Sequence, residues 1–175
     1  IAVLFFMGLS LSSFSQNAKS AIIKGNKAYK ANNYEAAEDQ YRDALKNSEN
    51  NFTADYNLGN ALYKTNKTDE AVKSYDNAIA NTTDSSVKQK AFYNKGVAYQ
   101  KEKKLPDCIS AYKSALLLNP NDEDARQNLQ RALKEEEKQK QNQQQKQNQN
   151  QNQQNKKKQQ PKDQPQNNQQ KNNEP

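Results

Sequence analysis

Apolar and small residues return at steps of three and four along most of the chain, and short polar stretches separate these segments. This period is that of amphipathic helices, because residues three or four apart share one face of a helix. The predicted helices form pairs over residues 18–31 and 35–47, 52–65 and 68–81, and 87–103 and 106–118. A last helix is expected after Pro120, with Asp122, Glu123 and Asp124 in its first turn, where the helix dipole favours acids. The pattern predicts an all-α fold of three helical hairpins and a C-terminal capping helix.

Three glycines, Gly25, Gly59 and Gly96, mark the same point of a repeated pattern, at spacings of 34 and then 37 residues. Other positions keep the same phase: the small residues Ala37, Ala71 and Cys108, the tyrosines Tyr41, Tyr75 and Tyr112, and the alanines Ala44, Ala78 and Ala115. A glycine inside a helix costs about 1 kcal/mol relative to alanine. Its recurrence predicts that a neighbouring helix passes too close for a Cβ, so that small and large residues interlock as the second helix packs on the first.

The middle repeat resembles a tetratricopeptide unit closely, with Leu58-Gly59, Ala71 four residues before Tyr75, and then Ala78. The resemblance implies a right-handed α-solenoid over residues 18–138, with repeats at about 18–51, 52–85 and 89–122. Three extra residues fall in the polar connection 81–86. Arrays of this family usually hold another protein or a peptide, so the resemblance implies a non-enzymatic adaptor.

The two ends of the chain differ from this array. Residues 1–15 are an apolar run followed by small residues, which is typical of a secretory signal peptide cleaved near Ser15, with a retained membrane anchor as the alternative. Residues 139–175 are rich in Gln, Asn and Lys and contain no apolar residue except proline. We expect this tail to be disordered, or at best to be a frayed extension of the last helix.

Composition and charge exclude several function classes. The chain has no histidine, which removes His-based catalysis and His-bearing metal sites. No phosphate-binding glycine loop is present, so we expect no enzyme activity, no cofactor and no metal. The formal net charge is +7, but most of it lies in the tail, which lacks stacking aromatic residues, and nucleic-acid binding is therefore disfavoured. Cys108 is the only cysteine and stands where the other repeats have alanine, which favours a small core residue over a reactive thiol.

The first helices of such hairpins line a concave groove, and polar and aromatic residues fall on that face. The candidate peptide-binding residues are Asn26, Tyr29, Tyr56, Asn57, Asn60, Tyr63, Lys64, Lys90, Tyr93, Asn94 and Lys101. Lys30 and Gln100 belong to the same face. Asparagine amides can bond to a peptide backbone and tyrosines supply flat contact area. The alternative is a solvated polar face with hydrogen bonds between repeats. Asn57 and Tyr93 are expected to lie outside the packed set of residues, so their loss should leave the fold intact.

Some family members hold a C-terminal carboxylate with a clamp of Lys, Asn, Asn, Lys and Arg. Asn26, Asn57 and Lys90 match that clamp, whereas Ile22 and Asn94 replace the first lysine and the arginine. Because two cations are missing, capture of a free carboxylate is not expected here.

The layout of apolar leader, three repeats and long Gln/Asn/Lys tail resembles the tetratricopeptide component of the Bacteroides-type aerotolerance system. That resemblance implies a periplasmic adaptor in a Gram-negative bacterium, working with membrane proteins that carry von Willebrand A-type domains. A self-associating scaffold without a groove ligand is the alternative.

Overall fold

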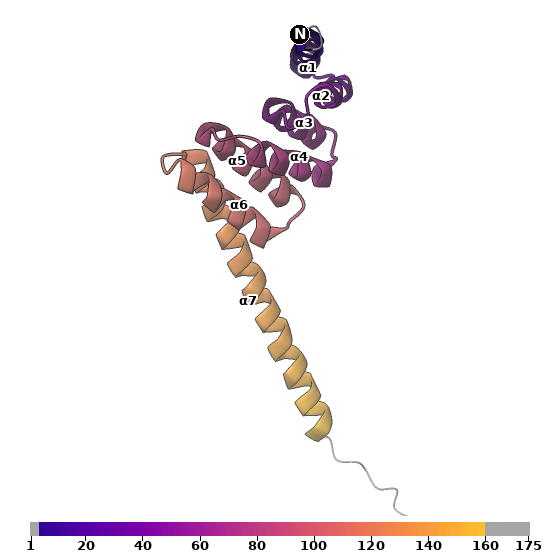
Figure 1. Cartoon of the computed structure of the whole chain (residues 1–175). Helices are drawn as coiled ribbons and strands as arrows, with labels where there is room; N and C mark the ends of the chain where they lie inside the picture. The colour runs from indigo at the N-terminus through magenta and orange to yellow at the C-terminus, as the bar shows by residue number, and fades with distance from the viewer. Residues whose placement is uncertain (1–3, 160–175) are drawn as a thin grey trace, which may run out of the picture. The chain divides into compact units, whose positions relative to one another are not determined.

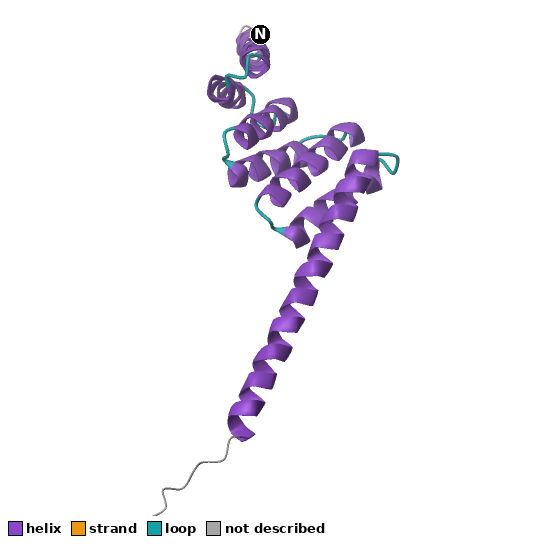
Figure 2. Cartoon of the chain, turned by 180° about the vertical axis from the view of Figure 1, so that it is seen from behind, coloured by secondary structure: helices purple, strands orange, loops and turns teal. Residues whose placement is uncertain are grey.

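The computed structural model describes residues 4–159, with side chains described for residues 16–151. This part of the chain consists of helices joined by short turns and loops and contains no strand (Figures 1 and 2). The helices are α1 (Leu4–Lys30), α2 (Tyr34–Asn47), α3 (Phe52–Lys64), α4 (Thr68–Ala80), α5 (Ser85–Lys101), α6 (Leu105–Leu118) and α7 (Glu123–Gln159). The chain divides into one unit up to residue 136 and a second from residue 137 onward. The first unit contains the three predicted hairpins α1–α2, α3–α4 and α5–α6, so the all-α prediction is confirmed.

The hairpin turns share one backbone geometry. Two residues after the first helix of each pair ends, the chain has a residue with a positive φ: 60° at Asn32, 64° at Asn66 and 57° at Lys103. The next amide then bonds back five residues, over 3.0 Å from Asn33 to Ala28, 2.9 Å from Lys67 to Leu62 and 3.0 Å from Lys104 to Tyr99. This bond is the one that closes a Schellman motif, and asparagine tolerates the left-handed conformation better than most residues. The turns therefore reverse the chain in the same way three times.

Each of the three repeated glycines faces the tyrosine of its own hairpin. A Cβ built on Gly25 would lie 2.5 Å from Cε1 of Tyr41, and the corresponding distance is 2.6 Å for Gly59 with Tyr75 and for Gly96 with Tyr112. These tyrosine rings are at most 2% exposed, so no ring can swing into solvent. The prediction that a neighbouring helix passes too close for a Cβ is confirmed.

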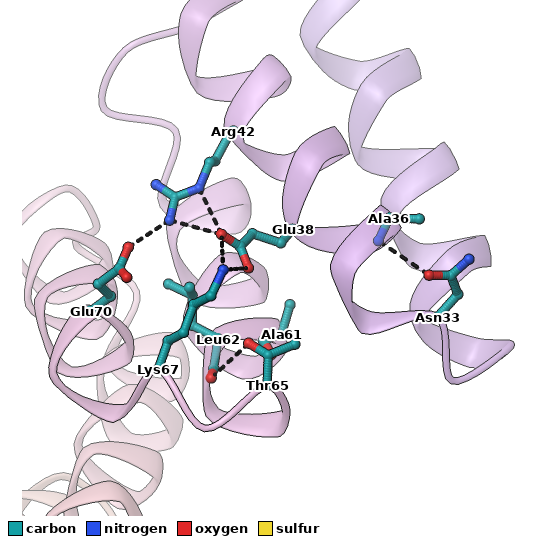
Figure 3. A network of polar contacts seen from close by, with 9 residues as sticks. All are labelled: Asn33, Ala36, Glu38, Arg42, Ala61, Leu62, Thr65, Lys67 and Glu70. Carbon is teal, nitrogen blue, oxygen red and sulfur yellow. Dashed lines mark hydrogen bonds and ion pairs between the residues drawn. The ribbon is translucent and has the colours of Figure 1, made fainter.

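A buried carboxylate joins the first two hairpins. Glu38 lies three residues before Tyr41, where the other repeats have Val72 and Ile109, and only 6% of it is exposed. Lys67 donates to both of its oxygens at 3.0 and 3.1 Å, Arg42 donates from Nε at 3.0 Å, and Arg42 also reaches Glu70 at 2.7 Å (Figure 3). Burial raises the pKa of Glu38, but the hydrogen bonds from Lys67 and Arg42 outweigh it and hold that pKa below its usual value.

The start of α7 closes the array. Leu129 and Ala132 pack on Leu105, Cys108, Ile109 and Tyr112 of the third hairpin. Asn128 donates to the Tyr93 hydroxyl, as Asn94 donates to the Tyr56 hydroxyl. Because Gly96 follows Asn94 by two residues, the equivalent position in α7 is Gln130. Gln130 is exposed, unlike the buried glycines of the repeats.

Three helix limits differ from the sequence-based prediction. α1 begins at Leu4 rather than near residue 18, and α5 begins at Ser85. α7 continues to Gln159, whereas the tail from residue 139 was expected to be disordered or at best a frayed extension of the last helix. The segment 139–159 contains no Gly or Pro and consists mainly of Gln, Lys and Asn, and Gln and Lys are good helix formers. The rest of the predicted tail, residues 160–175, lies outside the described residues. No helix within residues 4–159 is long and apolar enough to cross a membrane.

Candidate functional site

Three hollows follow the first helices of the hairpins, and we call the surface that carries them the first-helix face. They measure about 130, 290 and 300 Å³. The predicted groove residues that line them are Asn26, Tyr29, Tyr56, Asn57, Asn60, Tyr63, Lys64, Lys90, Tyr93 and Asn94. Lys101 lines none of the three, but its Nζ lies 4.8 Å above the Tyr63 ring and 2.5 Å from Asn66 Oδ1. The structure thus brings the predicted residues onto one surface.

Hydrogen bonds between asparagines link the first repeat to the second. Asn26 Oδ1 accepts from the Tyr41 hydroxyl at 2.8 Å and from Asn57 Nδ2 at 3.1 Å. Asn26 therefore fixes the buried tyrosine of its own hairpin and the first helix of the next one. Burial, with a smaller contribution from Tyr29, raises the pKa of Tyr41 to about 12. Its hydroxyl consequently remains a proton donor at neutral pH.

The same arrangement returns between the second and third repeats. Asn60 Oδ1 accepts from the Tyr75 hydroxyl and from Asn94 Nδ2, both at 2.9 Å. Asn94 Nδ2 also donates to the Tyr56 hydroxyl at 3.0 Å. We call these two sets of bonds the asparagine ladder. Hydrogen bonds between repeats were the alternative to a binding role, and the ladder shows that the asparagines make them.

The ladder leaves half of each amide unused. Among residues 16–151, whose side chains are described, no hydrogen bond involves Nδ2 of Asn26 or Asn60, or Oδ1 of Asn57 or Asn94. Each neighbouring pair of asparagines thus presents one donor and one acceptor, held in place by bonds made with the other half of the amide. The pattern occurs once at each of the two junctions between repeats.

Tyr93 is more deeply involved in packing than expected. Its ring centroid lies 5.8 Å from that of Tyr112, and its hydroxyl accepts a hydrogen bond from Asn128 at 3.0 Å. Tyr93 also packs against the apolar cluster around Leu105 and Cys108. The expectation that Tyr93 lies outside the packed set is therefore wrong, because α7 covers this side of the third hairpin and engages the ring. Asn57 likewise contributes to the ladder.

Charge is distributed unevenly along the first-helix face. Lys30, Lys64 and Lys101 are the last residues of α1, α3 and α5. At the other ends of the helices, Asp122 and Asp124 line the third hollow together with Lys90. Burial raises the pKa of the Tyr93 hydroxyl there, and Asp124 adds to the increase. Asp122 accepts from Gln89 Nε2 and from the Ala125 amide, so it also caps α7. The sequence predicted only that these acids complement the helix dipole, since no local sequence signal indicates that they lie near Lys90.

Comparison with known families agrees with this architecture. Models described as "Tetratricopeptide repeat" match residues 24–86 and 90–122. The chain is a tetratricopeptide repeat protein. The two matches together span the three hairpins. No curated protein sequence matches the chain.

Solved structures of this family share the fold. The chain is similar to the first tetratricopeptide domain of Spaghetti (RPAP3) bound to the HSP90 peptide SRMEEVD, at 28% identity and a TM-score of 0.64, covering 69% of this chain and 93% of that one. It is also similar to the second such domain of human RPAP3 in complex with the HSP70 peptide SGPTIEEVD, at 26% identity and a TM-score of 0.61, covering 70% and 97%. The TPR2B domain of yeast Sti1 shows the same fold at 17% identity and a TM-score of 0.64, covering 69% and 99%.

Proposed function

We propose that this protein is an adaptor that binds an extended peptide segment of a partner along the first-helix face. The observation that carries the proposal is the unused half of each ladder amide. An extended backbone offers alternating C=O and N–H groups. Nδ2 of Asn26 and Asn60 would donate to the carbonyls, and Oδ1 of Asn57 and Asn94 would accept from the amides. Since the other half of each amide is already bonded, little conformational entropy is lost on binding.

Two of the similar domains support the peptide class of ligand. The RPAP3 domains described above are bound to peptides that both end in Glu-Glu-Val-Asp. In this chain Ile22 and Asn94 stand where the carboxylate clamp has cations. We therefore propose that the ladder recognises the peptide backbone and that the complete carboxylate clamp does not form, which leaves Lys90 as the one clamp cation that this chain keeps.

An isosteric substitution separates binding from folding. Asn60→Asp keeps an Oδ1 acceptor for Tyr75 and Asn94 but replaces the unused Nδ2 donor by a second acceptor. We expect the full chain carrying Asn60→Asp to stay folded and to lose at least tenfold in affinity for peptides selected by display, since a buried carbonyl would lose its donor. Fluorescence anisotropy gives the affinities and circular dichroism checks the fold.

A matched control adds the same charge away from the face. Gln130 is exposed on α7 and lines none of the hollows described above, so Gln130→Glu should bind like the wild type. Equal affinities for wild type and Asn60→Asp would contradict the proposal and remove the binding site from this face.

We further propose that the adaptor acts in the bacterial envelope, after export, as part of an aerotolerance-type membrane complex. The apolar segment 1–15 and the Gln/Asn/Lys-rich tail support this, through the resemblance in layout, and membrane proteins with von Willebrand A-type domains are the partners it suggests. Protein made in a native-like Gram-negative host should begin near Gln16 on N-terminal sequencing. An uncleaved N-terminus in the membrane fraction would instead make the protein anchored.

Self-association is the alternative role. Leu117 on α6 is 84% exposed and Ile23 on α1 is 60% exposed, and large apolar side chains this accessible can lie in an interface between copies. Sedimentation equilibrium of the full chain distinguishes the two roles. A stable dimer that Leu117→Lys or Ile23→Lys dissociates would favour the scaffold.

A further inference from the structure

The three residues that lengthen the connection between the second and third repeats build an additional turn of α5. α3 begins at Phe52, seven residues before Gly59, whereas α5 begins at Ser85, eleven residues before Gly96. Asp84 caps the added turn, because its Oδ1 accepts from the amides of Ser86 at 2.8 Å and Val87 at 3.4 Å. Asp84 is itself held by a bond of 3.1 Å from its amide to Thr82 Oγ1. The insertion is thus ordered. Counted from the repeated glycine, Val87 lies two residues before the position at which α3 begins.

Val87 closes a fourth hollow, which the sequence pattern did not predict. This hollow measures about 160 Å³ and is lined by Phe52, Thr53, Tyr56, Val87 and Lys90. Its walls are mainly carbon, and an engineered apolar cavity of about 150 Å³ is large enough to hold benzene. Asn50 lies nine residues before Gly59, as Val87 does before Gly96, and Ala18 lies seven residues before Gly25, as Phe52 does before Gly59. The junction of the first two repeats therefore lacks the two apolar walls.

The hollow adjoins the first-helix face. Tyr56 and Lys90 line both this hollow and the neighbouring one near Tyr93. The hydroxyl of Tyr56 belongs to the asparagine ladder, where it accepts from Asn94 at 3.0 Å. A peptide that follows the ladder can therefore insert one side chain between Phe52 and Val87 without leaving the face.

A cation stands at the rim of this apolar hollow. Lys90 is exposed, and it forms no ion pair within the described part of the chain. The two acids that share its other hollow lie on the α7 side, and Asp122 is already bonded to Gln89 and the Ala125 amide. A ligand carboxylate would therefore meet Lys90 on the side of Phe52 and Val87.

We propose that this hollow is a specificity pocket that takes an aliphatic side chain of the size of leucine, from a residue next to a carboxylate. The proposal rests on the peptide-binding function above and adds the ligand class: an apolar residue followed by an acidic side chain or by the chain terminus. Val87 and Phe52 would select the side chain, and Lys90 would select the negative charge.

Small probes test the pocket directly on the full-length chain labelled with ¹⁵N. N-acetyl-leucine has the side chain and the carboxylate, N-acetyl-leucinamide lacks the charge, and N-acetyl-alanine lacks the apolar side chain. We expect saturable amide shifts at Thr53, Tyr56 and Val87 with N-acetyl-leucine, several-fold weaker binding of the amide, and about tenfold weaker binding of N-acetyl-alanine. Shifts confined to other residues, or equal affinity for the three probes, would overturn the pocket.

Variants assign the two roles within the pocket. Val87→Phe fills the hollow and should abolish binding of both leucine probes. Lys90→Gln should remove only the preference for the acid over the amide. Lys113→Gln, which removes an exposed lysine of α6, is the charge control and should change nothing. Retained preference in Lys90→Gln would contradict the role of the cation, and this arm remains decisive even if Val87→Phe disturbs the fold.

Two tetrapeptides distinguish the sources of the carboxylate. One has an internal Leu-Asp pair and a C-terminal amide, and the other ends in a leucine with a free carboxylate; at least one should compete with N-acetyl-leucine. The outcomes also separate this proposal from the previous one. If the affinity of display-selected peptides depends on Asn60 but not on Val87, the binding face is supported and the pocket is contradicted. Probes that fill the hollow while Asn60→Asp has no effect would reject the backbone recognition instead.

Discussion

Replacing Gly59 by alanine tests whether the repeated glycine is required by packing. The added Cβ would lie 2.6, 2.7 and 3.0 Å from Cε1, Cδ1 and Cζ of Tyr75. The ring is 1% exposed, and its hydroxyl bonds Asn60 at 2.9 Å, so relief of the clash must disturb the ladder as well. Overpacking of this kind costs up to about 3 kcal/mol, and alanine regains about 1 kcal/mol of helix propensity. We expect a net loss of about 2 kcal/mol.

The assay is urea unfolding of the full chain, followed by circular dichroism. Gly96→Ala should behave alike, because its Cβ would meet Tyr112 at the same 2.6 Å. A double mutant supplies the internal control: with Tyr75→Leu the ring is gone, and Gly59→Ala should then stabilise by about 1 kcal/mol relative to Tyr75→Leu alone. If Gly59→Ala stabilises the otherwise wild-type protein, helix propensity prevails and the steric reasoning is refuted.

Three further predictions follow from buried or tail residues. The lowered pKa of Glu38 means that its contribution to stability is complete above its unfolded pKa of about 4.3 and is lost as the pH falls through its lower folded pKa. Glu38→Gln should therefore cost about 1 kcal/mol at pH 7, and urea midpoints measured from pH 7 to pH 3 should fall less in the variant than in the wild type. Parallel curves for the two proteins would contradict this. Burial, with a smaller effect of Glu135, raises the pKa of Cys108 to about 11, so Ellman's reagent should label it at pH 8 only after unfolding, and rapid labelling of the native protein would refute its burial. Deletion of residues 141–175 should leave the melting temperature unchanged, because residues 139–175 offer no apolar side chain other than proline; a loss of several degrees would show that the tail packs on the array.

The features that the sequence predicted correctly are those that recur at the same position in each repeat. The close approach of a neighbouring helix at Gly59 could be inferred because a costly glycine recurs at the same phase in all three repeats, but the contact with the ring of Tyr75 came only from the structure. The groove asparagines were also predicted to share one face, and in the structure they do. Their partners could not be inferred, since a bond such as Asn94 to Asn60 depends on how closely two first helices approach.

Features that break the phase were missed for the same reason. Glu38 stands where Val72 and Ile109 are apolar, and that exception was the only available sign of a buried ion pair. Val87 lies next to the insertion, which looked like a loop from its polar composition alone. For residues 139–159 disorder was preferred over an extension of the last helix because the absence of apolar residues argues against a core, whereas helix propensity acts without one.

The doubly used Oδ1 of Asn60 constrains how such a protein can diverge. Apart from the isosteric Asn60→Asp, a mutation that alters ligand preference at Asn60 would also remove the bonds to Tyr75 and to Asn94 of the neighbouring helix, so most substitutions at the ladder would cost stability whatever the ligand. Val87 and Lys90 make no ladder bond and can vary without that penalty. Paralogues with the same architecture should therefore share their ladder asparagines and differ at these two positions, so that new specificities arise at the edge of the face while its centre stays constant.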